Sequence, residues 1–299
     1  MDRDVIVIME GGTIQGVFSA GVASILQKVN LYPRIHSIYA VSSGAHNAAY
    51  FLSRKVDVGA SIYHDYLLKR HSFLKHLSFK VIVKKILLLF FLGRSFDVID
   101  LAYIEDLERD ILPLDLTRIK TSPIKFLVRV FNPKTRKIEY LDARTNTIEK
   151  LIQSAKVPPY AYSRAHKDKY FDGGIMPTKS FLNDVVKKNP DKKIIYIFCD
   201  KKTFRRVTRF IMADLLDILF KTRYLGLRYG LKHLFNIYNY TYVSNLKKFK
   251  NVITVFDSTG NSKREKKKEK IMSAFNDGVI KGKHILKELK KIDQKQKES

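Results

Sequence analysis

The chain has 299 residues, of which 45% are hydrophobic, so it can bury a full core, and global disorder is excluded. Its formal net charge of +27 at pH 7 indicates an anionic partner, for which nucleic acid, an anionic membrane surface and an acidic ligand are the candidates. The single cysteine, Cys199, excludes an internal disulfide and a cysteine-based metal site, and it suits a reducing cytoplasm.

The first fifty residues predict alternating strands and helices. The β-branched run Val5 to Met9 is typical of a strand buried on both faces, and it is too short and too acidic at its flank for a secretory signal. A glycine-rich turn, EGGTIQG, leads into a helix over residues 17–29. A second buried strand at 35–41 precedes a helix over 42–54. This order predicts an α/β fold with a parallel sheet.

The rest of the chain continues this pattern. Further strands are expected at residues 124–132, 137–143, 193–200 and 251–257, and helices at 147–156 and 212–222. The charge run at 261–270 is interpreted as a solvated helix face, with a partner-binding patch as the alternative. One or two terminal helices are predicted after it. No repeat or linker divides the chain. We therefore predict one α/β domain over residues 1–260 and a basic helical extension over 261–299, packed on or beside it.

The most apolar segment, residues 76–92, is predicted to lie along a membrane interface. His76, Lys80 and Lys84 recur four residues apart and would form a basic stripe on a helix, and a buried helix is the alternative. Its uninterrupted apolar part, 86–92, is far too short to cross a bilayer. We expect no transmembrane helix and a cytoplasmic protein that binds the inner face of a membrane peripherally. The apolar face of this helix would contain Phe79, Ile82, Val83, Ile86 and Phe90.

Two adjacent serines follow the second strand, and one of them is the candidate nucleophile. A nucleophile elbow turns abruptly from strand to helix, so small residues must stand two places before and two places after the serine. Ala40 and Gly44 meet this requirement for Ser42, and no such pair flanks Ser43. The sequence thus favours Ser42, for which an ordinary helix N-cap is the alternative.

The glycine-rich turn, Gly11 to Gly16, precedes Ser42 by one strand–helix unit, so parallel packing brings both turns to the same edge of the sheet. Glycines allow backbone N–H groups to approach an oxyanion or a phosphate closely. A dinucleotide loop would need a different glycine spacing and an acidic residue after the second strand. The turn is therefore a candidate oxyanion loop.

The candidate base is Asp172, in the stretch KYFDGGIMP. It follows a short aromatic run and precedes two glycines, so it is predicted at the end of a strand, and a simple turn aspartate is the alternative. His233 and His284 lie in helix-like sequence and are expected at the surface. His46 lies one turn beyond Ser42 and is expected to point away from it.

Together these stretches resemble the patatin-like phospholipases, and the resemblance extends over roughly residues 4–200. It implies a three-layer α/β/α fold with a mainly parallel central sheet. It also implies a Ser42–Asp172 dyad that works without a histidine, and an oxyanion hole formed by the backbone of Gly11, Gly12 and Thr13. The residues that support the three motifs are Gly16, Ala40, Gly44, Gly173 and Gly174.

The resemblance implies a lipid acyl hydrolase of phospholipase A or lysophospholipase type, acting on a phospholipid or another acyl ester without metal or cofactor. The chain departs from the family at Thr13 and Ala40, where glycines are common, and at Gln15, where a basic residue is common. A weak or inactive lipid-binding protein of the same fold is the alternative. Nucleic-acid binding is less favoured because no recognised module is present. The lipid ester and the oligomeric state stay open.

Overall fold

The computed structural model describes six stretches of the chain. The predicted interfacial helix at 76–92 and the predicted helix at 212–222 lie outside them. The described residues are 3–68, 100–157, 169–175, 178–199, 249–261 and 265–298.

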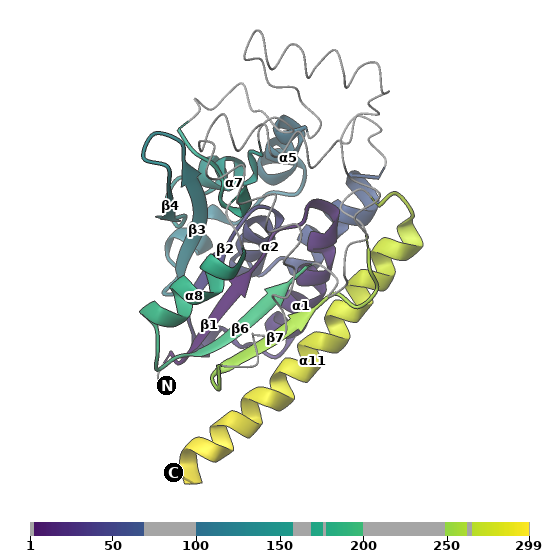
Figure 1. Ribbon diagram of the computed structural model, residues 1–299. Helices are drawn as coiled ribbons and strands as arrows, with labels where there is room; N and C mark the ends of the chain where they lie inside the picture. Colours follow the sequence, from purple (N-terminus) through teal and green to yellow (C-terminus); the bar gives the residue numbers. More distant parts are fainter. Residues whose placement is uncertain are drawn as a thin grey trace, which may run out of the picture.

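Seven strands of the described chain form one sheet with the order β4-β3-β2-β1-β6-β7, and β5 pairs with β3 (Figure 1). The pairs that join β3, β2, β1, β6 and β7 are all parallel, whereas β4 and β5 run antiparallel to β3. The predicted mainly parallel sheet is confirmed. The strands are β1 (Val5–Met9), β2 (Ile35–Ala40), β3 (Lys125–Asn132), β4 (Lys137–Asp142), β5 (Phe171–Asp172), β6 (Lys193–Phe198) and β7 (Val252–Phe256).

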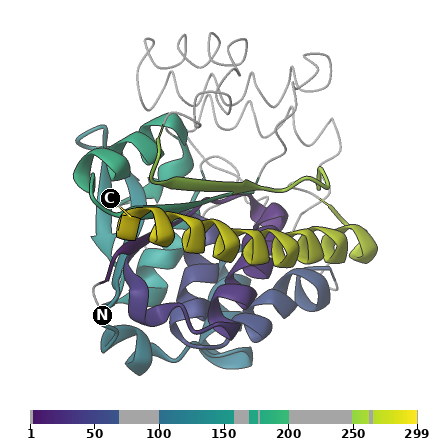
Figure 2. The same cartoon turned by 90° about the horizontal axis from the view of Figure 1, so that it is seen from below.

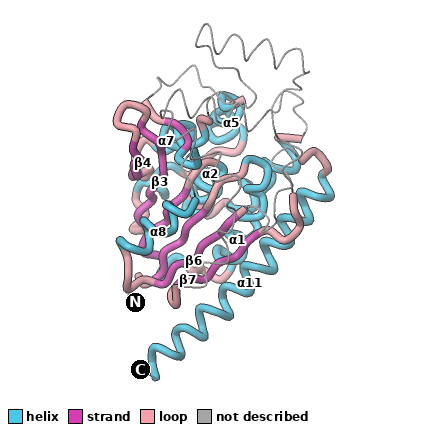
Figure 3. The backbone as a smooth tube through the Cα atoms, in the orientation of Figure 1, coloured by secondary structure: helices cyan, strands magenta, loops and turns pink. Residues whose placement is uncertain are grey.

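Helices cover both faces of this sheet (Figure 3). Val5, Val7 and Met9 of β1 belong to the larger apolar core, whereas Ile6 and Ile8 belong to a second core on the opposite face. Strand side chains alternate between faces, so a continuously apolar strand needs a helical layer on each side. The predicted three-layer α/β/α arrangement is confirmed. Helices α1 (Gly16–Lys28), α2 (Ser43–Leu52), α7 (Thr147–Ala155) and α11 (Lys268–Glu298) contribute to the larger core, and α8 (Thr178–Lys188) contributes to the second.

The chain ends in a single long helix, α11, that lies along α1 (Figure 2). The two helices touch through glycines: a Cβ at Gly21 would collide with the carbonyl oxygen of Phe275, and one at Gly278 would collide with that of Phe18. Backbone contact of this kind is possible only without side chains at the crossing. Helix α11 is therefore built into the fold.

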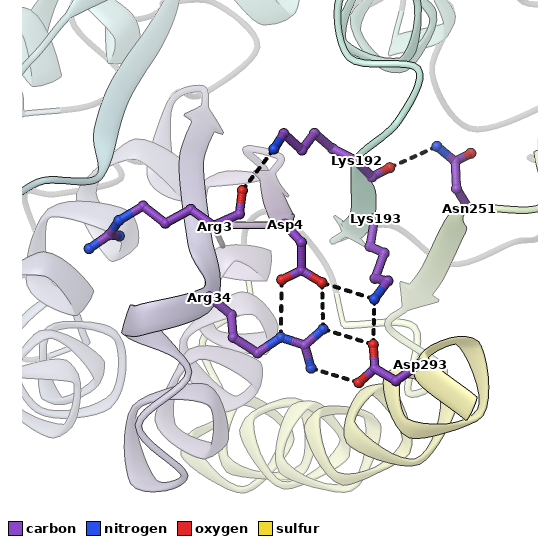
Figure 4. A network of polar contacts seen from close by, with 7 residues as sticks. All are labelled: Arg3, Asp4, Arg34, Lys192, Lys193, Asn251 and Asp293. Carbon is purple, nitrogen blue, oxygen red and sulfur yellow. Dashed lines mark hydrogen bonds and ion pairs between the residues drawn. The ribbon is translucent and has the colours of Figure 1, made fainter. Parts of the chain in front are cut away.

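Charged residues fasten the far end of α11 to the amino ends of the strands (Figure 4). The Arg34 guanidinium contacts Asp4 at 2.7 Å and Asp293 at 2.8 Å, and the Lys193 ammonium contacts both carboxylates as well. Burial raises the pKa of Asp4, but hydrogen bonds from Arg34 and Lys193 outweigh it and lower that pKa to about 2. Both carboxylates are thus ionised at neutral pH.

Within the described stretches, every helix is too short or too polar to span a bilayer.

Candidate functional site

Ser42 occupies a strained turn between β2 and α2. Its backbone has φ 52° and ψ −135°, a conformation that residues with a Cβ rarely adopt and that costs roughly 1–3 kcal/mol. Although Ser42 stands at the N-cap position, its side chain makes no capping hydrogen bond. A Cβ at Gly44 would collide with the Met9 carbonyl oxygen, which explains the glycine there. The geometry is that of a nucleophile elbow, with buried Ala40 two residues before the serine.

A serine that the sequence analysis did not single out holds this turn. The Ser42 N–H donates to the hydroxyl of Ser154 at 2.7 Å, and Ser154 lies fully buried on α7. The preceding N–H, of Val41, donates to the Met9 carbonyl at 3.1 Å. A polar residue on the core-facing side of an amphipathic helix was the available signal for Ser154, because buried hydroxyls need partners.

The glycine loop lies directly against Ser42. A Cβ at Gly11 would stand 2.5 Å from the Ser42 Cβ and 3.2 Å from its Oγ. The N–H of Gly12 donates to the Ser43 hydroxyl at 3.0 Å, so this predicted oxyanion donor is already used within the protein. The N–H groups of Gly11 and Thr13 make no hydrogen bond within the described chain. These two N–H groups are therefore not used within the described chain.

The side chain of Gln15 connects the glycine loop to the segment before α11. Its side-chain Nε2 donates to the Asn261 carbonyl at 2.7 Å in a buried contact, so the side chain is directed toward the segment before α11. Gly16 allows α1 to approach, since a Cβ there would lie 2.6 Å from both the Ser43 and the Tyr63 hydroxyl oxygens. Burial raises the pKa of the neighbouring Cys199 to about 12, so this cysteine is a thiol at neutral pH and does not act as a nucleophile.

Strand pairing places Asp172 beyond the end of β2. In β3, Val128 pairs with Ala40 of β2, and Val130 pairs with Asp172 of β5. Because β4 occupies the other edge of β3 along this stretch, β5 lies on the edge that β2 leaves as it turns at Ser42. The Asp172 carboxylate is buried, with 4% of the residue exposed, and it accepts the Gly174 N–H at 2.6 Å. Asp172 therefore lies two positions along β3 from Ala40, on the edge that β2 leaves just before Ser42.

The two glycines after Asp172 are required by close contacts. A Cβ at Gly173 would stand 2.7 Å from the Arg129 side chain and from its carbonyl oxygen, and one at Gly174 would stand 2.9 Å from the carboxylate of Asp172. The N–H of Asp172 donates to the Lys156 carbonyl at 2.9 Å, which fixes the strand to the end of α7. These close contacts and hydrogen bonds thus fix the position of Asp172 in the turn.

A largely apolar cavity adjoins Ser42. Its volume is about 70 Å³. Its lining includes Thr13 and Ser42 and residues of α2, of the π-helix Ile62–Tyr66 and of α5 (Leu101–Asp106). Apolar walls of this kind suit a hydrocarbon group of a ligand. Its apolar lining includes Tyr50, Ile62, Tyr63, Leu67, Leu101 and Ile104.

The cavity wall also contains a histidine and a glutamate that form a pair. His46, expected to point away from Ser42, lines the same cavity, and its Nδ1 lies 2.6 Å from Oε1 of Glu108. No sequence signal marked Glu108, which follows α5 in the π-helix Leu107–Ile111. His284 is exposed on α11, as expected, and His233 lies outside the described residues. No cluster of three His, Cys, Asp or Glu side chains suited to a metal occurs in the described stretches.

Comparison with known proteins finds distant structural similarity and no match to a family model or curated protein. VipD from Legionella pneumophila is 14% identical with a TM-score of 0.46, and the match covers 96% of this chain and 67% of that one. A chain of the complex of full-length SpcU with full-length ExoU from the type III secretion system of Pseudomonas aeruginosa is also 14% identical, with a TM-score of 0.32. That match covers 78% of this chain and 52% of the other. Likeness at this level defines neither fold nor activity.

Proposed function

We propose that the protein is a serine lipid acyl hydrolase, of phospholipase A or lysophospholipase type, that uses a Ser42–Asp172 dyad. The observation that carries the proposal is the strained Ser42 turn, which adjoins both a glycine loop and an apolar cavity. Strain of this kind at a cleft is typical of functional residues. The resemblance of the three sequence motifs to the patatin-like phospholipases supports the same assignment.

In the proposed reaction, the Ser42 hydroxyl attacks an ester carbonyl while Asp172 accepts its proton. The developing oxyanion accepts hydrogen bonds from the N–H groups of Gly11 and Thr13. The carbon–oxygen bond to the alcohol then breaks, and the alcohol leaves with the proton from Asp172. Water attacks the acyl-serine, Asp172 takes the water proton, and the carboxylic acid is released as Ser42 recovers its proton. The proposed steps call on no metal or cofactor.

The substrate class follows from the cavity and the charge. An apolar cavity beside the nucleophile suits the acyl chain of a phospholipid or another acyl ester. The formal charge of +27 would draw the protein to anionic lipid surfaces, and this attraction weakens with salt. We therefore propose an anionic lipid surface as the place of action.

A second candidate is a lipid-binding protein with weak or no turnover. It is favoured by the Gly12 N–H, which donates to Ser43 and so is withheld from an oxyanion. Each oxyanion donor removed costs an enzyme roughly 10²–10³ in kcat. Binding of acyl chains without cleavage would identify this candidate.

Hydrolysis of p-nitrophenyl decanoate and of a fluorogenic phospholipid tests the proposal. Wild type should cleave both, and Ser42→Ala should cleave neither while keeping the wild-type thermal melt. Ser43→Ala is the matched control, because it removes the neighbouring hydroxyl and releases the Gly12 N–H. It should keep most of the activity. Loss of activity in Ser43→Ala with retention in Ser42→Ala would overturn the assignment of the nucleophile.

A further inference from the structure

A hydrogen-bonded imidazole–carboxylate pair lies in the wall of the cavity beside Ser42. His46 Nδ1 and Glu108 Oε1 are 2.6 Å apart, and 9% and 1% of these residues are exposed. The surrounding wall is largely apolar. Desolvation makes such a pair costly, and apolar residues of similar volume often serve stability equally well. A contribution to folding stability therefore does not explain why a polar pair occupies this position.

The pair has hydrogen-bonding capacity left for a ligand. Oε2 of Glu108 is buried and has no hydrogen-bond partner in the described chain. Nδ1 of His46 is engaged with Glu108, and no described residue contacts Nε2 of the same ring through a hydrogen bond. Because His46 lines the cavity, a polar group of a bound molecule can meet this ring.

Ser42 and His46 are close in the chain and line the same cavity. Ser42 stands at the N-cap of α2, and the N–H of His46, four residues later, donates to the Ser42 carbonyl at 3.4 Å. Both side chains contribute to the cavity wall. An acyl carbonyl at Ser42 thus places the next few carbons of its chain in the cavity that His46 lines.

We infer that the His46–Glu108 pair selects acyl chains that carry a hydroxyl on the β carbon, the second carbon beyond the carbonyl. A hydroxyl fits either protonation state of the ring, because it donates to a neutral Nε2 and accepts from a protonated one. An unsubstituted chain would leave the pair without a partner in an apolar wall, which disfavours its binding. The inference rests on the proposed function, since it places the acyl carbonyl at Ser42.

The experiment compares p-nitrophenyl decanoate with each enantiomer of p-nitrophenyl β-hydroxydecanoate, after subtraction of spontaneous hydrolysis. Wild type should prefer one hydroxylated enantiomer by at least about tenfold in kcat/KM, as expected for a single charge-assisted hydrogen bond. In His46→Leu this ratio should fall to about one. The matched control is His64→Leu, which removes a histidine that pairs with Asp65 at 3.0 Å and does not line the cavity. It should keep the wild-type ratio.

Equal kcat/KM values for all three esters in wild type would overturn the inference whether or not His46→Leu folds. An unchanged ratio in a folded His46→Leu would overturn it as well. If wild type cleaves none of the esters, the proposed hydrolase is wrong, and the affinities for free decanoate and β-hydroxydecanoate then test the cavity alone. Tighter binding of the hydroxy acid that is lost in His46→Leu supports the inference, and equal affinities contradict it.

Discussion

Asp172 and Ala40 occupy the same edge of β3, two positions apart, because β5 pairs with the part of β3 that β2 leaves free. Ala40 is the last residue of β2 and pairs with Val128, and two residues further along β3 the partner is Asp172. The short strand β5 thus pairs with the next part of the same edge of β3, beyond the point where the chain turns away at Ser42. Asp172 therefore lies beyond the carboxyl end of β2, at the edge of the parallel strands where ligands of such sheets bind.

Replacing Asp172 by asparagine should lower kcat for ester hydrolysis by orders of magnitude. The amide has nearly the same shape but does not accept the serine proton. The measurement is kcat/KM with p-nitrophenyl decanoate, and His284→Ala on the exposed face of α11 is the control that should match wild type. A His46→Leu variant that loses activity as completely as Asp172→Asn on all esters would instead identify the imidazole as the base.

Gln15→Ala should lower the free energy of unfolding by about 1–2 kcal/mol and reduce kcat more than it changes KM. The variant removes the buried hydrogen bond to the Asn261 carbonyl and leaves that carbonyl without this donor. The glycine loop would lose its connection to the segment before α11. Chemical denaturation and steady-state kinetics provide both readouts, and Gln294→Ala, exposed on α11, should change neither. A stable Gln15→Ala with wild-type kcat would contradict the anchoring role.

Gly278→Ala should destabilise the protein by about 1–3 kcal/mol, although alanine is the better helix former. The added methyl group would collide with the Phe18 carbonyl oxygen and force α11 away from α1. Thermal unfolding measures this effect. Lys283→Ala, at an exposed position of the same helix, should leave the melting temperature nearly unchanged. An increase in stability for Gly278→Ala would show that the two backbones do not touch.

Acid should weaken the network that fastens α11 to the strands. Although burial raises the pKa of Asp4 and of Asp293, hydrogen bonds from Arg34 and Lys193 lower both pKa values, that of Asp4 to about 2. A lowered native pKa means stability that is present above the unfolded value of about 4 and is lost as the pH falls toward 2. Asp293→Asn should therefore destabilise the protein at pH 7, and less so at pH 3.

Urea unfolding at both pH values measures this difference. The control is Glu288→Gln, which removes a partly exposed carboxylate that pairs with the exposed Lys291 on the same helix. Exposed pairs contribute little, so this variant should resemble wild type. The same loss of stability for Asp293→Asn at both pH values would contradict the ionised network.

Much of the fold was predictable because its central strands, such as β1 and β6, are short and almost entirely apolar. Val5 to Met9 has no polar face, and such a strand fits only the middle of a sheet covered on both sides. The antiparallel direction of β4 was not assigned, since strand composition does not encode it. Gly278 and Gly282 left the number of terminal helices open, because glycine weakens a helix and also permits close helix contact.

The site was predictable where the motif is local and not where it depends on distant partners. Ala40, Ser42 and Gly44 follow from the steric needs of one turn. The place of His46 in the cavity wall was not predictable, because its ring contacts Glu108, which is 62 residues away and is carried by a helix without a motif. The Gly12 N–H is used by Ser43, 31 residues away, and the spacing of glycines gives no sign of that contact.

The most direct test of the central claim is covalent labelling with a fluorophosphonate, followed by peptide mapping by mass spectrometry. Fluorophosphonates react with activated serine nucleophiles, so wild type should gain one adduct, on Ser42, and Asp172→Asn should label much more slowly. Ser42→Ala should gain none, and Ser43→Ala should label like wild type. An adduct on Ser43, or ester hydrolysis that persists in Ser42→Ala, would contradict the account.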